Sequence, residues 1–362
     1  YFIHPLEFEK IHSSFMESPL DPVQWIATPT SSSRSLIISD KDKNFMPFIA
    51  KTAMNNKMAG FLRTINRDYG INAVTSNAIY QEMFSQTAGK IPNTNKTWNY
   101  YSESMAMGSK KHPELYTIMR GFPSHYNKNI YLPFYALISE RENNKRWIDI
   151  LYQNSNYKNK LQFAWQEIVK PMLELDILLR FDHGIISDPH QQNIVIVVSP
   201  ETNNIVGFSL RDLDQNWIDY PVRKYILKKT TPDLTHQNSE THHYLESIEN
   251  PMFSYEVFKD SIIKNIFSFF LDKDEIDRMV GGGNDLILKA FNQRYSHLVG
   301  ETTHYLDIKN SFSKMREVNL SKNEKRFFIQ QALENKKKTS FIEGVGTKVL
   351  NNYYLLKQKL EK

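Results

Sequence analysis

The sequence contains no cysteine among its 362 residues, which excludes disulfide bonds, thiolate metal sites and cysteine nucleophiles. It also lacks an apolar run long enough to span a bilayer, and its first residues show no signal-peptide pattern. These absences argue against a disulfide-stabilised secreted protein and against a membrane protein. We expect a cytoplasmic protein that has no membrane partner.

An excess of charge of one sign is also missing, because 45 Lys and Arg residues stand against 40 Asp and Glu residues, a net charge of +5. The basic clusters at residues 223–229 and 334–338 are short and far apart in the sequence. A nucleic-acid partner requires a more continuous basic surface, so we expect none. A small anionic substrate needs only a local group of cations.

Apolar residues make up 40% of the sequence and charged residues 23%, which is ordinary for a globular protein with two or more subdomains. Apolar periodicity and turn residues predict a mixed α+β fold with a boundary near residues 142–158. Residues 86–112 are predicted to be rich in turns. Strand character is predicted within residues 22–38, 45–51 and 129–140, and a β-hairpin within residues 193–214.

Three helical regions are predicted from apolar spacing. The first covers residues 52–70 and stops at Gly70, the second covers residues 160–184 and is closed by Gly184, and the third follows residue 240. We expect the glycine triplet at residues 281–283 to interrupt the third region as a flexible turn. No Lys-Ser or Lys-Thr follows the triplet, so it does not predict a phosphate-binding loop.

A dense group of hydrogen-bonding side chains, residues 188–193, directly precedes the β-branched first strand of the predicted hairpin. The hairpin brings Asn193, at the start of one strand, and Asp212, at the end of the other, to the same end of a sheet. Asn and Asp oxygens suit Mg²⁺, which prefers hard oxygen ligands. Together with His190, this layout predicts a site for nucleotide chemistry.

Two families share this layout, and the first comprises the kinase-like phosphotransferases. Their catalytic Asp lies two residues after the His and is followed by an Asn and a later metal-binding Asp. Here Gln192 occupies the place of the catalytic Asp, so the general base is missing. Residues 28–48, which precede Lys51, contain no glycine and therefore no glycine-rich loop. This family remains the second hypothesis.

The chain has a closer resemblance to the siderophore synthetases that work without a nonribosomal peptide synthetase, the aerobactin-synthetase-like family. The similarity runs from about residue 20 to about residue 320 in a consistent order. Ser35 replaces the family's Thr, and Asp188 replaces its Glu. The matching elements are the Ser-x-Arg-Thr element at Ser32, Arg34 and Ser35, the strand lysine at Lys51, the helix arginine at Arg63, the Glu-x-His-x-Gln-Asn motif at Asp188, His190, Gln192 and Asn193, the Arg-Asp strand end at Arg211 and Asp212, and the late Lys and Arg at Lys314 and Arg316.

The resemblance implies a cupped-hand architecture of fingers, palm and thumb, in which the palm is distantly kinase-like. It implies that residues 1–145 are the remainder of an ATP-binding domain and that residues 146–362 form a FhuF-like palm and thumb domain. Family members have a longer segment before the Ser-x-Arg element than the roughly thirty residues present here. We therefore expect an N-terminal part, and with it one wall of the nucleotide pocket, to be missing.

The resemblance also implies a reaction, in which ATP activates a carboxylate of citrate or a related acid and an amine or alcohol then displaces AMP. The implied cofactors are ATP and Mg²⁺, and the implied partners are the small carboxylate and the amine or alcohol; if the chain self-associates, we expect a homodimer. A third hypothesis is a degenerate binding protein that keeps the pocket without turnover. The implied site residues are His190, Arg63 and Lys314 for the carboxylate, Ser32, Arg34, Ser35, Lys51, Gln192, Asn193 and Asp212 for the nucleotide, and Asp188, Asn193 and Asp212 for the metal.

Overall fold

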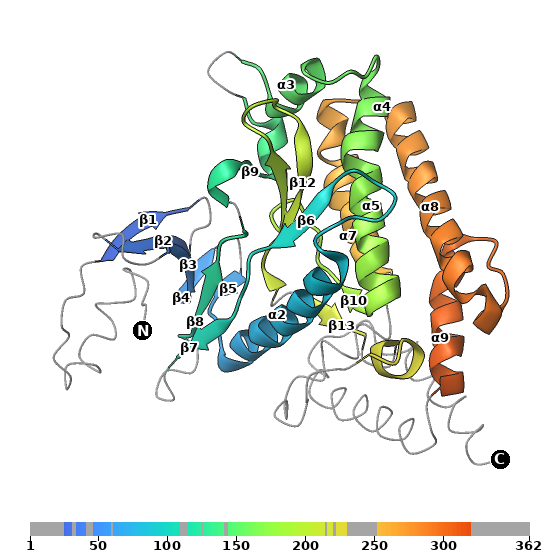
Figure 1. The fold of residues 1–362 in the computed structure, drawn as a ribbon, viewed down its shortest axis with the longest axis horizontal. Coiled ribbons are helices and arrows are strands. Elements are labelled where there is room, and N and C mark those ends of the chain that lie inside the picture. Colours follow the sequence, from blue (N-terminus) through green and yellow to red (C-terminus); the bar gives the residue numbers. More distant parts are fainter. Residues whose placement is uncertain are drawn as a thin grey trace.

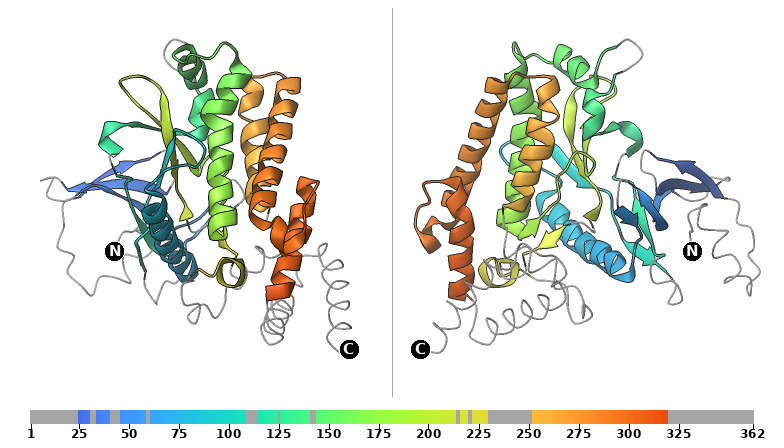
Figure 2. Two further views of the ribbon diagram at one scale, coloured as in Figure 1. Left: turned by 45° about the vertical axis from the view of Figure 1, so that its right-hand side comes forward. Right: turned by 180° about the vertical axis from the view of Figure 1, so that it is seen from behind.

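The computed structural model describes residues 25–30, 34–40, 46–58, 61–108, 115–124, 126–140, 144–213, 216–219, 222–229 and 252–319. Within this part, two larger β-sheets lie on one side of a layer of helices (Figures 1 and 2). The mixed α+β class predicted from the sequence is confirmed. Among the described helices, none combines the length and the apolar character needed to cross a membrane.

A five-stranded antiparallel sheet is built mainly from the first part of the chain. The β3–β8 register places Lys51 opposite Ile118 and Arg120 opposite Ile49. Since opposed residues and alternate residues share a face, Lys51 and Arg120 project from the same face. The strand predicted at residues 45–51 is confirmed as β3. The strands in spatial order are β1 (Trp25–Pro29), β2 (Ser35–Asp40), β3 (Phe48–Thr52), β8 (Thr117–Gly121) and β7 (Met105–Met107).

The helix predicted over residues 52–70 is wrong. The chain instead forms an antiparallel pair of short strands, β4 (Met54–Met58) and β5 (Phe61–Arg63), before helix α2 (Arg67–Thr87) begins. The reason is long-range backbone pairing on either side of the pair of strands. The Ala53 amide donates to the Tyr116 carbonyl at 3.2 Å, and the Tyr116 amide donates to the Ile65 carbonyl at 2.8 Å.

Helix α2 begins beyond the predicted helix, and Gly70 lies inside its first turn. Asn66 caps the helix, because its side-chain oxygen accepts a hydrogen bond from the Tyr69 amide at 2.9 Å. A Cβ atom on Gly70 would lie 2.7 Å from the Cβ of Ala106 in β7. Gly70 therefore permits close packing of α2 on the five-stranded sheet and does not stop a helix.

The second sheet has four strands, which come from distant parts of the chain. β11 and β12 form the predicted hairpin, which is confirmed, while β12 also pairs with β6 in parallel. The sheet combines strands from both predicted domains, and the division near residue 145 stays a prediction. In spatial order the strands are β6 (Thr97–Tyr100), β12 (Ile205–Leu210), β11 (Ile194–Val198) and β9 (Ile130–Pro133).

Helices cover one face of the four-stranded sheet (Figures 1 and 2). The helical run predicted over residues 160–184 is confirmed, and it ends before Gly184, whose φ is 66°. The remaining short elements include the strand pair β10 (Ile185–Ile186) and β13 (Trp217–Ile218). The helices are α3 (Trp147–Gln153), α4 (Lys160–Ala164), α5 (Lys170–Ile177), α7 (Phe253–Phe258), α8 (Lys273–Val299) and α9 (Ile308–Asn319), with π-helical turns at Trp165–Val169, Leu178–Asp182, Val222–Ile226 and Lys259–Lys264 and 3₁₀ turns at Tyr126–Lys128, Phe134–Ile138, Phe267–Phe269 and Tyr305–Asp307.

The interruption predicted at the glycine triplet is wrong, because α8 runs through residues 281–283 without a break. A Cβ atom on Gly282 would lie 3.1 Å from the Trp165 ring, and one on Gly283 would lie 2.9 Å from the Tyr255 hydroxyl oxygen. These glycines therefore allow α8 to approach the neighbouring helices closely. Tertiary packing outweighs the low helix propensity of glycine here.

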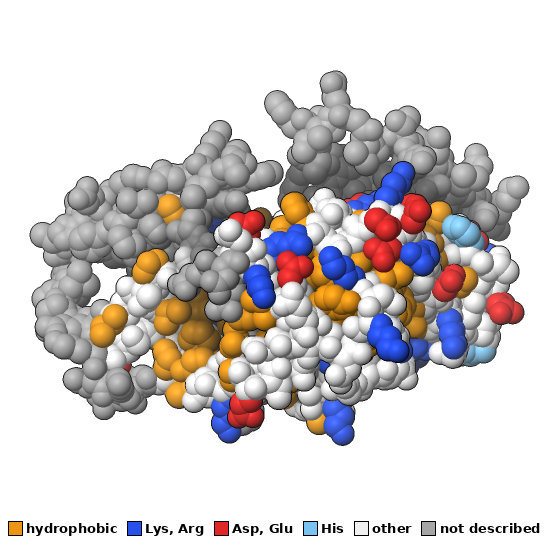
Figure 3. All heavy atoms as spheres, turned by 90° about the horizontal axis from the view of Figure 1, so that it is seen from above, with side chains coloured by type: hydrophobic (Ala, Val, Ile, Leu, Met, Phe, Trp, Pro, Cys, Tyr) orange, Lys and Arg blue, Asp and Glu red, His pale blue; other side chains and the backbone are white. Residues whose placement is uncertain are grey.

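A single large hydrophobic core fills the space between the four-stranded sheet and the helices. Ile196 and Phe208 contribute to it from the sheet, and Leu173, Phe181 and Phe291 from the helices, and all five are fully buried. On the described surface seen from above, basic and acidic side chains are interspersed (Figure 3). The core fixes the hairpin end that carries Asp212 against the rest of the molecule.

Candidate functional site

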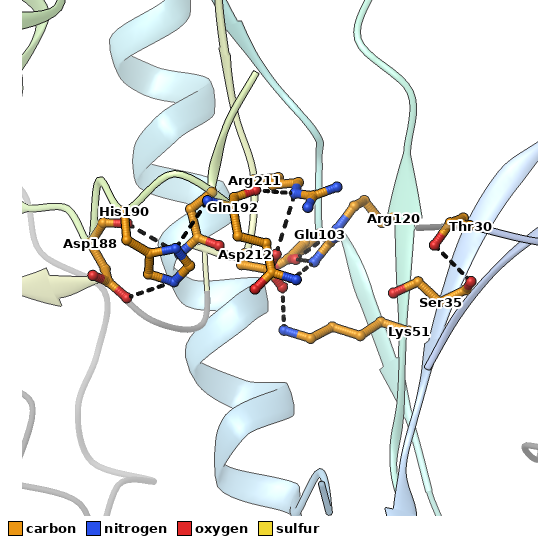
Figure 4. Close-up of polar contacts among 11 residues, drawn as sticks. Thr30, Ser35, Lys51, Glu103, Arg120, Asp188, His190, Gln192, Arg211 and Asp212 are labelled. Carbon is orange, nitrogen blue, oxygen red and sulfur yellow. Dashed lines mark hydrogen bonds and ion pairs between the residues drawn. The ribbon is translucent and has the colours of Figure 1, made fainter. Parts of the chain in front are cut away.

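Asp212 lies where the two larger sheets meet, and two cations from the five-stranded sheet converge on one of its oxygens (Figure 4). The Oδ1 atom is 2.5 Å from Lys51 Nζ and 2.8 Å from Arg120 Nη2. Its Oδ2 atom is 3.7 Å from Arg211 Nε. Lys51 comes from β3 and Arg120 from the adjacent β8, so the register of that sheet creates the pair.

The backbone at Asp212 has a φ of 60°, in the left-handed region that residues with a Cβ atom seldom adopt. Asp tolerates this region better than most residues. The preceding residue closes the hairpin, because the Arg211 amide donates to the Asn193 carbonyl at 3.0 Å. The sequence prediction that Asn193 and Asp212 reach the same end of the sheet agrees with this pairing.

Glu103 and Arg120 are functional candidates that sequence reasoning missed. Arg120 Nε donates to Glu103 Oε1 at 2.9 Å, and Arg120 Nη2 contacts the same oxygen at 2.5 Å. Both side chains are buried, with exposed fractions of 3% for Arg120 and 0% for Glu103. A lone arginine in the otherwise apolar strand sequence "YTIMRG" was the available signal.

The cations and carboxylates of this cluster stabilise one another in their charged forms. Burial alone raises the pKa of Asp212, but Arg120, Lys51 and Arg211 outweigh burial and hold that pKa well below its usual value. Burial alone lowers the pKa of Arg120, but Asp212 and Glu103 outweigh it and raise the pKa. Three cations, Lys51, Arg120 and Arg211, therefore meet two carboxylates, and these five side chains together carry a net charge of +1.

The loop before β11 holds His190 beside this cluster (Figure 4). His190 Nδ1 accepts a hydrogen bond from the Gln192 amide at 3.1 Å, so the ring proton is on Nε2, which lies 3.5 Å from Asp188 Oδ2. The side chain of His190 is 35% exposed and can meet a ligand. Asn193 is buried and braces the loop, because its Nδ2 donates to the Asp188 carbonyl at 3.1 Å.

Arg211 joins the loop to the end of the hairpin. Its Nε donates to the Gln192 carbonyl at 2.7 Å and also lies near Asp212. The side chain of Gln192 is exposed, and its backbone carries this contact. The loop and the cation cluster are therefore one connected structure.

The described part of the Ser-x-Arg element, Arg34 and Ser35, lies next to Lys51. Ser35 pairs with Lys51 across β2 and β3, and the Thr52 amide donates to the Arg34 carbonyl at 2.8 Å. Arg34 Nη1 donates to the Thr64 carbonyl at 3.2 Å. Ser32 lies outside the described residues. The structure thus brings Arg34 and Ser35 together with Lys51.

Two predicted site residues are not brought to the cluster by any described contact. Arg63 lies in β5 and not on a helix, and only its backbone is described. Lys314 is exposed on α9, which lies at the opposite side of the helical layer from β3 and β8 (Figures 1 and 2). Arg316 is also on α9, and its side chain is not described. Roles for Arg63 and Lys314 stay predictions.

The cluster fits a polyanion better than it fits a metal ion. Oδ1 of Asp212 already meets two cations, so a divalent cation there would have to displace Lys51 and Arg120. Asp188 pairs with His190 and not with Asp212. Among the described residues, no group of three or more His, Cys, Asp or Glu side chains could hold a metal. The Mg²⁺ assignment to Asp188, Asn193 and Asp212 gains no support from this geometry.

Comparison with solved structures shows that the fold is that of siderophore synthetases, which confirms the resemblance at the level of the fold. The petrobactin biosynthesis protein AsbB from Bacillus anthracis matches with a TM-score of 0.57 and 16% identity over 88% of this chain. The aerobactin synthetase IucC from a hypervirulent pathotype of Klebsiella pneumoniae matches with a TM-score of 0.53 and 13% identity over 83% of this chain. This chain covers 60% of AsbB and 54% of IucC. No family model matches the sequence, and a search of curated proteins found no relative.

Proposed function

We propose that the chain acts in an ATP-dependent ligase of siderophore biosynthesis, which adenylates a carboxylate of citrate or a related acid and joins it to an amine or alcohol. The observation that carries the proposal is the convergence of Lys51 and Arg120 on Asp212, beside the accessible His190, in a fold shared with siderophore synthetases. A buried cluster with net positive charge is what a triphosphate and a carboxylate both require.

Each described side chain has a physical role in this proposal. Lys51 and Arg34 bind the phosphates, and Ser35 lies on the strand beside them. Arg211 holds the loop that carries His190. His190 has its donor at Nε2, which faces Asp188 Oδ2 at 3.5 Å, and by exchanging that contact it would donate to a carboxylate oxygen or to negative charge that develops at the attacked phosphorus. ATP supplies the activated phosphorus when it is bound.

Arg63 and Lys314 remain proposed carboxylate ligands on the resemblance alone. Ser32, Gln192 and Asn193 remain proposed nucleotide contacts on the same ground. The Mg²⁺ site also remains a proposal from the resemblance, and no role described above depends on it. We also propose the citrate-like acid, the cytoplasmic location and the cupped-hand shape from the resemblance.

The test is to identify the nucleotide product. The chain is incubated with ATP, Mg²⁺ and a panel of carboxylates that includes citrate, with hydroxylamine as a small nucleophile, and AMP, ADP and pyrophosphate are measured. Carboxylate-dependent AMP and pyrophosphate are expected. ADP in their place would support the kinase-like phosphotransferase, and ATP binding without turnover would support the degenerate binding protein.

A further inference from the structure

We propose that Arg120, fixed by Glu103, is a positioning residue that shares the Asp212 carboxylate with Lys51 and so leaves Lys51 only partly neutralised. The inference rests on the proposed function, because it takes Lys51 as the phosphate-binding cation. Arg120 and Lys51 are almost equally buried, with exposed fractions of 3% and 4%, but Arg120 already uses Nε and Nη2 to contact Glu103 and Asp212. It therefore acts through Asp212.

The orientation of Arg120 is fixed from the side opposite Asp212. Nε and Nη2 both donate to Oε1 of Glu103, so two guanidinium nitrogens hold Arg120 against one carboxylate oxygen. Glu103 is fully buried, and its amide donates to Asn77 Oδ1 in α2 at 2.9 Å. Helix α2 thus supports Glu103, and Glu103 supports Arg120.

Asp212 shows the effect of that support. Its left-handed backbone is a conformation that persists only where neighbouring contacts hold it. One oxygen of its carboxylate serves both Lys51 and Arg120, so its negative charge is divided between two cations. Without Arg120, the same oxygen would serve Lys51 more completely, and Asp212 would compete more strongly with a phosphate for that ammonium.

A buried ion pair can also be no more than part of a core, and the chain offers a control for this. Arg180 is 2% exposed and lies 2.8 Å from Asp176, within the helical layer. It matches Arg120 in residue type and burial but lies in another part of the fold. The variant Arg180→Lys measures how the loss of a buried arginine elsewhere in the fold affects binding and stability.

The main test is the double variant Glu103→Gln/Arg120→Met. It removes one buried charge of each sign, so no buried charge is orphaned and the net local charge stays at +1. Binding of inorganic tripolyphosphate is measured by calorimetry without metal. We expect binding about tenfold weaker than in the unchanged chain, equivalent to about 1.4 kcal/mol. Arg180→Lys should bind tripolyphosphate as the unchanged chain does, with a lower melting temperature.

Asp212→Asn should strengthen tripolyphosphate binding more in the double variant than in the unchanged chain, since without Arg120 the carboxylate competes more strongly for Lys51. A purely structural role for Arg120 predicts the same gain in both. Should the double variant fail to fold, Arg120→Lys keeps the charge but loses the guanidinium nitrogens that contact Glu103 and Asp212, and we expect about threefold weaker binding. The inference is overturned if the variant that folds binds tripolyphosphate as the unchanged chain does, or if Asp212→Asn gives no larger gain in the double variant than in the unchanged chain. It is also overturned if the unchanged chain does not bind tripolyphosphate. ATP binding without pyrophosphate release overturns the proposed reaction alone.

Discussion

Ser35 and Lys51 lie directly opposite each other on the antiparallel strands β2 and β3. Two motif elements that are separate in the sequence are therefore neighbours on one face of a sheet. Arg34 is tied to the same place, since its carbonyl accepts from the Thr52 amide. This pairing gives a structural reason for the order of the motif and supports Lys51 as the first residue to test.

Lys51→Met should weaken tripolyphosphate binding at least tenfold, because a charge-assisted contact is worth about 1.5–3 kcal/mol. Lys96→Met is the matched control. The Lys96–Glu167 pair has side-chain exposures of 5% and 18%, against 5% and 16% for Lys51–Asp212. Lys96 also donates to the Ile205 carbonyl, at the end of β12 remote from Asp212. Equal losses of binding in both variants would contradict a phosphate role for Lys51.

The variant Asp212→Asn distinguishes between two roles for Asp212, that of a metal ligand and that of a carboxylate that neutralises the neighbouring cations. If Asp212 chiefly neutralises Lys51 and Arg120, the substitution should strengthen tripolyphosphate binding several-fold in the absence of Mg²⁺, because the local charge rises. If Asp212 holds Mg²⁺, ATP binding in the presence of Mg²⁺ should fall while metal-free binding is unaffected. Calorimetric titrations with and without EDTA measure both quantities. We expect the first result.

The glycines of α8 should respond in opposite directions to the same substitution. Gly283→Ala should lower the free energy of unfolding by about 1–3 kcal/mol, because its Cβ would crowd the Tyr255 hydroxyl. Gly281→Ala places its Cβ in open space and should raise the free energy of unfolding by up to about 1 kcal/mol through helix propensity. Urea unfolding measures both. A stabilising Gly283→Ala would contradict the close packing of α8.

His183 should make stability depend on pH. Burial, with Lys229 and Arg223 nearby, lowers its pKa to about 4, and its Nδ1 lies 2.9 Å from Lys229 Nζ. Since the unfolded value is about 6.5, the unfolded chain takes up this proton first as the pH falls. The contribution is complete above about pH 6.5, declines between about 6.5 and 4, and is lost below, a change of roughly 3 kcal/mol.

Urea unfolding of the unchanged chain and of His183→Gln at several pH values tests this dependence. The variant should be less stable near neutral pH, because Lys229 loses its imidazole partner. Its stability should also fall less steeply between about pH 6.5 and 4. The same slope in both proteins would show that other groups cause the pH dependence.

Local sequence patterns correctly predicted the hairpin and the helical run at residues 160–184, whereas pairing between residues distant in the sequence could not be predicted. The β-branched run before and after the turn at residues 199–204 identified the hairpin, because those residues favour strands wherever they are buried. The stretch at residues 52–70 has apolar spacing that fits a helix, yet its fold depends on Tyr116, a distant residue. The turn predicted at the glycine triplet is wrong for a similar reason, since the neighbours of Gly282 and Gly283 belong to other helices.

The candidate site likewise contains some residues that the sequence predicted and others that it did not. Lys51, Arg211 and Asp212 stand in recognisable order in the sequence, and the structure brings them together. Arg120 contacts Asp212 across 92 residues, and nothing local to Arg120 predicts that contact. Its role depends on which strand lies next to β3, and that adjacency follows from the assembled sheet.

The parallel pairing of β6 with β12 has a consequence for how the chain acquires its structure. Lys96 meets Ile205 across 109 residues, so during synthesis β6 is exposed long before its partner strand is made. β9 likewise precedes β11 by the whole of the helical run from Lys160 to Asp182. Such non-local pairings fold slowly and leave strand edges open to other chains. A shortened version that ends before residue 210 should therefore aggregate, even though every strand of the five-stranded sheet is already present.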